Sequence, residues 1–176
     1  MGLKSLTYPI LFILIIFLLM FIKILPLDTI PKEWIGPDVL FCVILTWCLR
    51  RPLSAPIVLI GLLFLLQDIL FQRPPGLYAG CATLVCEWCK RQVLRAEDFP
   101  FVAEWLTASI AIVAVFVLSQ GIASLSLIAT PPTVMFVKEL MPTILAYPVV
   151  VVLLRYGFGL RTQQMSGFDA SLGQEH

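Results

Sequence analysis

The stretch that decides the fold class of this chain is residues 57–84, which read IVLIGLLFLLQDILFQRPPGLYAGCATL. An unbroken apolar run ends at one acid, Asp68, and a turn with the sequence Gln-Arg-Pro-Pro leads into a segment that contains Gly76 and Gly80. A charged side chain in or near lipid is costly unless it is paired or hydrated. Small residues behind the turn allow a second helix to pack closely against the first. The stretch therefore predicts a helical hairpin within a membrane.

The composition of the whole chain also indicates a membrane protein. The 176 residues are 60% hydrophobic and 13% charged, whereas a soluble domain is about half apolar. The net charge of +1 leaves no basic field that would attract nucleic acid. The apolar residues are gathered into six hydrophobic segments, at about residues 7–25, 36–49, 54–71, 77–90, 101–128 and 133–156.

We therefore predict an all-α integral membrane protein. Residues 1–156 would form one transmembrane domain, a six-transmembrane-helix bundle, and residues 157–176 a flexible cytoplasmic tail. Crossing the hydrocarbon takes about 20 helical residues. The segments 36–49 and 77–90 are shorter, so an arrangement of four spans with these two re-entrant remains open.

Two details of the ends of this domain need separate interpretation. The first apolar run lacks a small-residue cleavage site and continues into Lys23-Ile24-Leu25-Pro26, so we expect a retained first span rather than a signal peptide. Before the last span, Val134, Val137 and Met141 share one helical face, which predicts a short interfacial helix over residues 133–141.

The positions of the cations predict the topology. With six spans and both termini cytoplasmic, eight Lys and Arg residues lie on the inside and four lie outside, as the positive-inside rule expects. The inside set is Lys4, Arg50, Arg51, Lys90, Arg91, Arg95, Arg155 and Arg161, and the outside set is Lys23, Lys32, Arg73 and Lys138.

The sequence offers little for catalysis or metal binding. The only histidine is His176, and no Ser-His-Asp set, paired-carboxylate motif or phosphate-binding glycine loop is present. Cys86 and Cys89 have CxxC spacing but lack a second ligand pair, so we interpret all five cysteines as small apolar residues. We predict no catalytic residues, no cofactor and no metal.

The polar residues of the spans each have two interpretations. Asp68 is either a proton or substrate site or a structural acid, which pairs with Arg73 or caps the outer turn, and we favour the structural role. Glu87 is explained by a surface pair with Lys90 or Arg91.

Gly76 and Gly80 lie four residues apart and allow close helix contact. That contact would be made either within the bundle or with the helix of another protein.

The order of motifs along the chain resembles one known family. Leu25-Pro26 ends the first span, the second span runs from Gly36-Pro37-Asp38-Val39-Leu40 to Trp47, and Arg50-Arg51 follow. Gly61-Leu62-Leu63, Asp68-Ile69-Leu70 and Pro75-Gly76-Leu77 form the hairpin, and a last span from Pro142 to Leu154-Arg155 closes the chain. This order resembles MreD, the family of bacterial rod-shape-determining membrane proteins. Phe64 stands where that family usually has a glycine, and the turn Phe71-Gln72-Arg73-Pro74 lacks the usual glycine.

The resemblance implies a non-enzymatic adaptor of the cell-elongation machinery in the bacterial inner membrane. Its fold would be similar to the substrate-binding subunits of energy-coupling-factor vitamin transporters. It would dock the transmembrane helix of MreC and link MreB filaments to peptidoglycan synthesis by RodA and the elongation transpeptidase. The structural or partner-binding candidates are Asp38, Asp68, Arg73, Gly76 and Gly80.

A rival interpretation comes from another functional class. A small-molecule uptake subunit would bind a vitamin-like ligand in the outer half of the bundle, with Asp38, Asp68 and Arg73 as the available polar groups. The sequence does not distinguish a monomer from a homo-oligomer.

Overall fold

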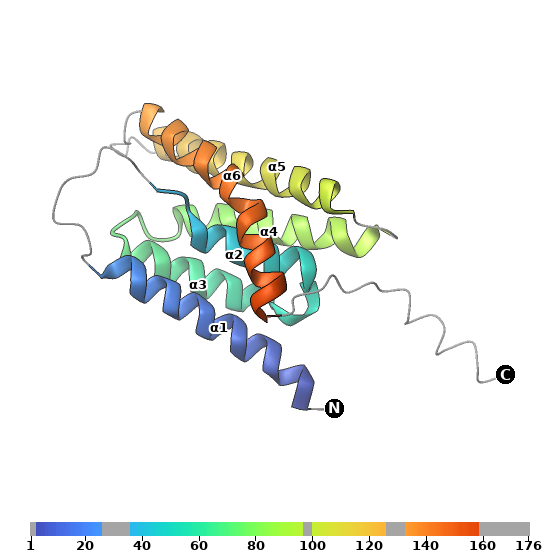
Figure 1. Cartoon of the computed structure of the whole chain (residues 1–176). Coiled ribbons are helices and arrows are strands. Elements are labelled where there is room, and N and C mark those ends of the chain that lie inside the picture. Colours follow the sequence, from blue (N-terminus) through green and yellow to red (C-terminus); the bar gives the residue numbers. More distant parts are fainter. Residues whose placement is uncertain (1–2, 26–35, 97–99, 126–132, 159–176) are drawn as a thin grey trace.

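A short apolar helix, α2, lies at the centre of the structure (Figure 1). The structure is a computed structural model that describes residues 3–25, 36–96, 100–125 and 133–158. Over these residues it contains six α-helices and one short 3-10 turn, and no strand. The elements are α1 (Leu3–Ile24), α2 (Val39–Arg50), η1 (Pro52–Ser54), α3 (Ile57–Leu70), α4 (Leu77–Arg95), α5 (Phe101–Leu125) and α6 (Thr133–Phe158).

The sequence of α2 explains its central place. Every residue from Leu40 to Arg50 is buried, and a helix that is apolar all round has no face to offer to water. It contacts α1, α4, α5 and α6. Asp38 caps its first turn by accepting the N–H of Phe41 at 3.3 Å. The helix ends where Pro52 disfavours a helical conformation at Arg51.

The predicted hairpin is formed by α3 and α4. A Cβ placed on Gly61 would lie 3.6 Å from Oγ1 of Thr83, so the two helices approach closely at this glycine. The turn between them uses left-handed backbone at Gln72 (φ 53°) and Gly76 (φ 89°). Gly76 therefore precedes α4 as its N-cap and is not part of a helical glycine face, which corrects the prediction from spacing. Gly80 is exposed, and a Cβ placed on it would meet nothing within 4 Å.

The last helix differs from the prediction. Residues 133–141 do not form a separate interfacial helix, because α6 is continuous from Thr133 to Phe158 and includes Pro142 and Pro148. Pro148 has no N–H to donate to the carbonyl of Ile144. The indole Nε1 of Trp105 on α5 donates to that carbonyl at 3.5 Å, so the freed acceptor has a partner from the neighbouring helix.

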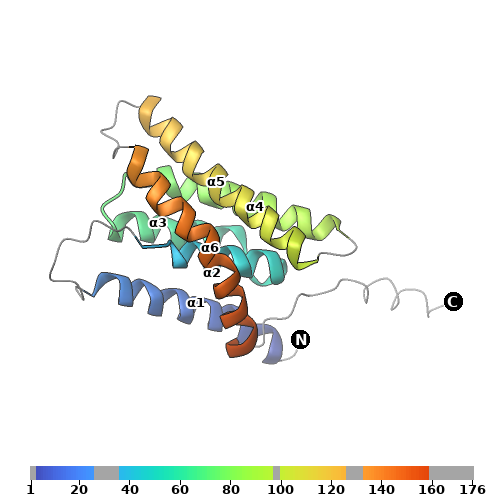
Figure 2. The ribbon, with the colours of Figure 1, turned by 45° about the horizontal axis from the view of Figure 1, so that its top comes forward.

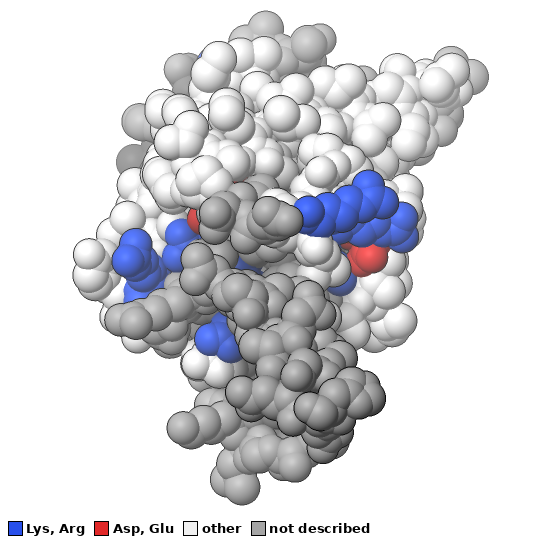
Figure 3. Space-filling model, turned by 90° about the vertical axis from the view of Figure 1, so that its right-hand side faces the viewer, with Lys and Arg blue, Asp and Glu red and all other residues white. Residues whose placement is uncertain are grey.

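Successive helices run in opposite directions, so the helix ends and the turns between them gather at two ends of the bundle (Figures 1 and 2). At one end, which we call the Asp38 end, Lys23 in the last turn of α1 contacts Asp38, and Arg73 after α3 contacts Glu139 on α6. The Arg50 end carries the described cations Arg50, Arg51, Lys90, Arg91, Arg95 and Arg155. Figure 3 looks onto this end, where blue side chains lie at several places and red ones are few. Among the residues that the structure describes, the cations predicted for opposite membrane sides thus lie at opposite ends.

The exterior of the bundle is apolar. Leu84 (71% exposed), Val58 (68%) and Leu145 (67%) are examples of large hydrophobic side chains that point outward. By length and composition, two helical stretches of the described residues could cross a membrane, Phe101–Leu125 and Val137–Gly157. The apolar stretches in α1, α2 and α3 are shorter than a span. These features favour association with a membrane. The predicted tail over 157–176 lies almost wholly outside the described residues, which end at 158.

We predict that Gly61→Leu destabilises the bundle and that Gly80→Leu does not. A leucine at Gly61 would force α3 away from Thr83, and overpacking of this kind costs about 1–3 kcal/mol. At Gly80 the same side chain would enter open space. Thermal unfolding of both variants in detergent measures the difference. Equal melting temperatures would mean that the Gly61–Thr83 approach is not a tight contact.

Candidate functional site

The Asp38 end holds a cluster of polar side chains, which we call the Asp38 cluster. Its members come from α1, α2, the α3–α4 turn, α4 and α6, and they are Lys23, Asp38, Arg73, Tyr78, Glu139 and Thr143.

Asp38 is the hub of this cluster and is 1% exposed. Its Oδ1 lies 3.5 Å from Nζ of Lys23, and its Oδ2 accepts the hydroxyl of Tyr78 at 3.1 Å. Its own N–H donates to Oγ1 of Thr143 on α6 at 3.0 Å. A buried carboxylate is tolerated when its oxygens have donors, so the contacts with Lys23 and Tyr78 make the burial of the Asp38 carboxylate possible. Together with the bond to Thr143, they also tie the start of α2 to three other helices.

Arg73 joins the same cluster from the turn. One of its Nη atoms lies 3.6 Å from Oε1 of Glu139, and its guanidinium lies over the ring of Tyr78 at 4.9 Å. Burial acts to lower the pKa of this guanidinium, but the carboxylates of Asp38 and Glu139 raise it above its ordinary value. Arg73 is therefore a permanent cation that connects the turn with α6.

Asp68 has the structural place that we favoured, but with different partners. Its Oδ2 accepts the N–H groups of Gly76 at 3.0 Å and Ala79 at 3.1 Å, so it caps the start of α4. The predicted ion pair with Arg73 is not among the ion pairs of the described residues, in which Arg73 pairs with Glu139. The alternative in which Asp68 caps the turn is confirmed, and the alternative in which it pairs with Arg73 is wrong. The side chain is fully buried.

The Arg50 end holds a second buried group, the Arg50–Glu104–Tyr147 cluster. Nε of Arg50 donates to Oε1 of Glu104 at 2.8 Å, and Nη2 donates to Oε2 at 3.0 Å. The hydroxyl of Tyr147 on α6 donates to the same Oε1 at 3.2 Å. This two-point pairing is the geometry in which arginine and carboxylate bind most strongly. Sequence reasoning missed it, although Glu104 was visible as an acid at the start of an apolar segment.

One helix connects both clusters. Glu139, Thr143 and Tyr147 follow one another at intervals of four residues along α6, so they share a face. The first two belong to the Asp38 cluster, and the third contacts Glu104. The polar groups of this face are therefore bonded to α2, the α3–α4 turn and α5. Such an arrangement positions helices relative to one another.

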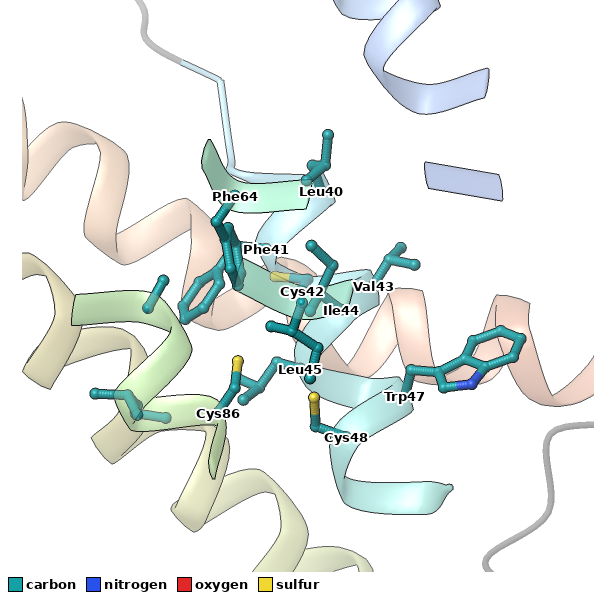
Figure 4. Close-up of a cluster of buried hydrophobic side chains, with 14 of the residues drawn as sticks. Leu40, Phe41, Cys42, Val43, Ile44, Leu45, Trp47, Cys48, Phe64 and Cys86 are labelled. Atoms are coloured by element: carbon teal, nitrogen blue, oxygen red, sulfur yellow. The ribbon is translucent and has the colours of Figure 1, made fainter. Parts of the chain in front are cut away.

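The remaining polar candidates lie apart from these clusters. Glu87 pairs with Lys90 at 3.0 Å and with Arg91 at 3.6 Å, as predicted. All five cysteines are buried free thiols, and Cys48 and Cys86 lie close together in the core (Figure 4). Within the described residues, no group of three or more His, Cys, Asp or Glu side chains could hold a metal ion.

The structure thus brings four of the five candidates together in two pairs. Asp38 and Arg73 share one cluster through Tyr78, whereas Asp68 and Gly76 meet at the start of α4, and Gly80 lies on the outer face of that helix. Comparison of the chain with protein-family profiles, with curated proteins and with solved structures gives no match.

We predict that Asp68→Ala lowers the stability of the protein, because two N–H groups of α4 would lose their acceptor. The loss of a helix cap costs about 0.5–2 kcal/mol. Asp68→Asn keeps a side-chain oxygen and should cost less. Thermal unfolding in detergent should rank the melting temperatures as wild type, Asn variant and Ala variant.

Arg91→Ala is the matched control for this series, since the Arg91 side chain is 66% exposed and an exposed pair such as the one it makes with Glu87 contributes little. An Asp68→Ala protein with unchanged melting temperature and lost function in cells would contradict the capping role and favour a chemical one.

Proposed function

We propose that this protein is a non-catalytic inner-membrane adaptor of the MreD type, which docks the transmembrane helix of MreC. The observation that carries the proposal is that the buried charged groups bond to other elements of the bundle, whereas the exposed surface is apolar. The charged side chains of Asp38, Asp68 and Glu104 are bonded to other parts of the same bundle, and the outward surface is apolar. Buried charges used in this way fix the arrangement of helices, and an apolar exterior suits contact with lipid and with partner helices.

The proposal places six helices across the membrane with both termini in the cytoplasm. Its support is the separation of cations between the two ends, with six at the Arg50 end and Lys23, Arg73 and Lys138 at the Asp38 end among the described residues. In this orientation the Arg50 end faces the cytoplasm, as the positive-inside rule requires.

Labelling of single introduced cysteines tests this topology. Arg73→Cys and Lys138→Cys should react with a membrane-impermeant maleimide in intact cells, whereas Arg91→Cys should react only after permeabilisation. The five native cysteines are buried, so their background should be low. The reverse pattern of labelling would invert the proposed orientation, and labelling of all three sites in intact cells would exclude a spanning bundle.

The open side of α4 offers a surface for the partner. Gly80 is exposed and has no neighbour that a Cβ would meet, so a helix from another chain could approach the backbone there. We predict that Gly80→Leu leaves the yield of the protein unchanged and lowers the recovery of MreC in a detergent pull-down.

A control variant and the protein yield show whether a loss of MreC is specific to the Gly80 surface. Leu145→Ala changes another exposed apolar residue, on α6, and should leave MreC recovery as in the wild type. If Gly80→Leu recovers MreC normally, the docking surface lies elsewhere. A low yield of Gly80→Leu would mean that this face is an internal contact after all.

One observation favours the rival uptake function. Nε2 and Oε1 of Gln67 and Oδ1 of Asp68 are buried without a hydrogen-bond partner among the described residues. A bound polar small molecule would supply such partners. If a vitamin-like compound co-purified with the wild type and was lost in Gln67→Leu, this rival would replace the adaptor role.

A further inference from the structure

A second arginine at the end of α2 has no role in the clusters described above. The guanidinium carbon of Arg51 lies 3.7 Å from the ring centroid of Tyr8, so the side chain stacks on an aromatic ring of α1. This contact fixes the orientation of the guanidinium. Stacking uses the face of the guanidinium, whereas its N–H donors lie in its plane and make no bond to the ring of Tyr8. Nε of Arg51 is buried and has no hydrogen-bond partner among the described residues.

The nearby acids are already occupied. The described acids at the Arg50 end are Glu87 on α4, which pairs with Lys90 and Arg91, and Glu104 on α5, which pairs with Arg50. None of the described ion pairs involves Arg51. Arg51 is thus a stacked guanidinium without a carboxylate partner among the described residues, and such a group is suited to an anion that comes from outside the chain.

A second cation stands at the same corner. Arg155 lies in the last turn of α6, which packs against α2, and its side chain is exposed. Both Figures 1 and 2 draw this end of α6 beside the first part of α1, the helix that carries Tyr8. The elements that carry or adjoin these residues also expose large apolar side chains, with Leu53 69% exposed on η1, Ile10 58% on α1 and Leu153 64% on α6.

We propose that this corner binds the headgroup of an anionic phospholipid of the inner leaflet. The phosphate would accept from the guanidinium groups of Arg51 and Arg155, and the acyl chains would lie on the exposed apolar faces of α1 and α6. Cations beside apolar surface at the cytoplasmic boundary attract anionic headgroups. The inference rests on the membrane location in the proposed function, and it is independent of the adaptor role.

Lipid retention tests the site. The full-length protein is reconstituted in liposomes of equal phosphatidylglycerol and phosphatidylcholine, extracted in mild detergent, and the retained lipids are quantified. The wild type should retain phosphatidylglycerol preferentially. Arg51→Gln and Arg155→Gln should each lower the ratio of phosphatidylglycerol to phosphatidylcholine about fivefold. Arg51→Lys keeps the charge but loses the planar fork, so its ratio should fall between these values.

Arg91→Gln is the matched control, because Arg91 is exposed at the same end but lies on α4. It should leave the ratio unchanged. Arg155 is exposed, so its variant remains informative if Arg51→Gln yields no folded protein. The proposal is overturned by a wild type without preference, by unchanged ratios in Arg51→Gln and Arg155→Gln, or by an equal fall in Arg91→Gln. It is also overturned if Arg51→Gln loses MreC and keeps the lipid. A protein that stays soluble without detergent or liposomes would refute the membrane location itself.

Discussion

The burial of α2 with a charged residue at each end is the constraint on which the rest of the structure depends. Taking a carboxylate or a guanidinium out of water costs several kcal/mol unless its hydrogen bonds are replaced. Asp38 is 1% exposed and Arg50 is 5% exposed, so the surrounding helices must supply those bonds. Tyr78 and Lys23 contact the carboxylate of Asp38, Thr143 accepts the backbone N–H of Asp38, and Glu104 accepts from Arg50. The partners must come from α1, α4, α5 and α6, which fixes where these helices lie.

The same constraint explains the form of α6. Two prolines would permit a break in this helix, and the polar pattern of residues 133–141 resembles that of a surface segment. Glu139, Thr143 and Tyr147 instead face the other elements, because each contacts a polar group of one of them. A bundle held in this way at both ends leaves its outer surface free for lipid and for partner helices. We therefore connect its structural charges with the proposed adaptor role.

Much of the fold could be predicted from the sequence, because apolar runs and prolines mark where helices begin and end. The six segments correspond to the six helices, and the separation of cations corresponds to the two ends of the bundle. The pair of Glu87 with Lys90 was predictable because the two residues are neighbours on one helix.

The contacts between distant parts of the chain could not be predicted in the same way. Arg50 and Glu104 are 54 residues apart, and no local pattern states that α2 and α5 meet there. The partners of Asp68 are backbone N–H groups, which carry no signal in the sequence. The left-handed backbone of Gly76 removed it from the predicted glycine face, and the open surroundings of Gly80 depend on which helices pack elsewhere.

A double-mutant cycle on Arg50 and Glu104 tests most directly whether buried pairs hold α2 in place. Replacing one partner alone, as in Glu104→Leu, should lower the free energy of unfolding by about 3–5 kcal/mol, because a charge remains buried without its partner. Adding Arg50→Met to Glu104→Leu should recover most of that loss. If the loss in the double variant equals the sum of the losses in the two single variants, the account is contradicted, since the two side chains would then act independently.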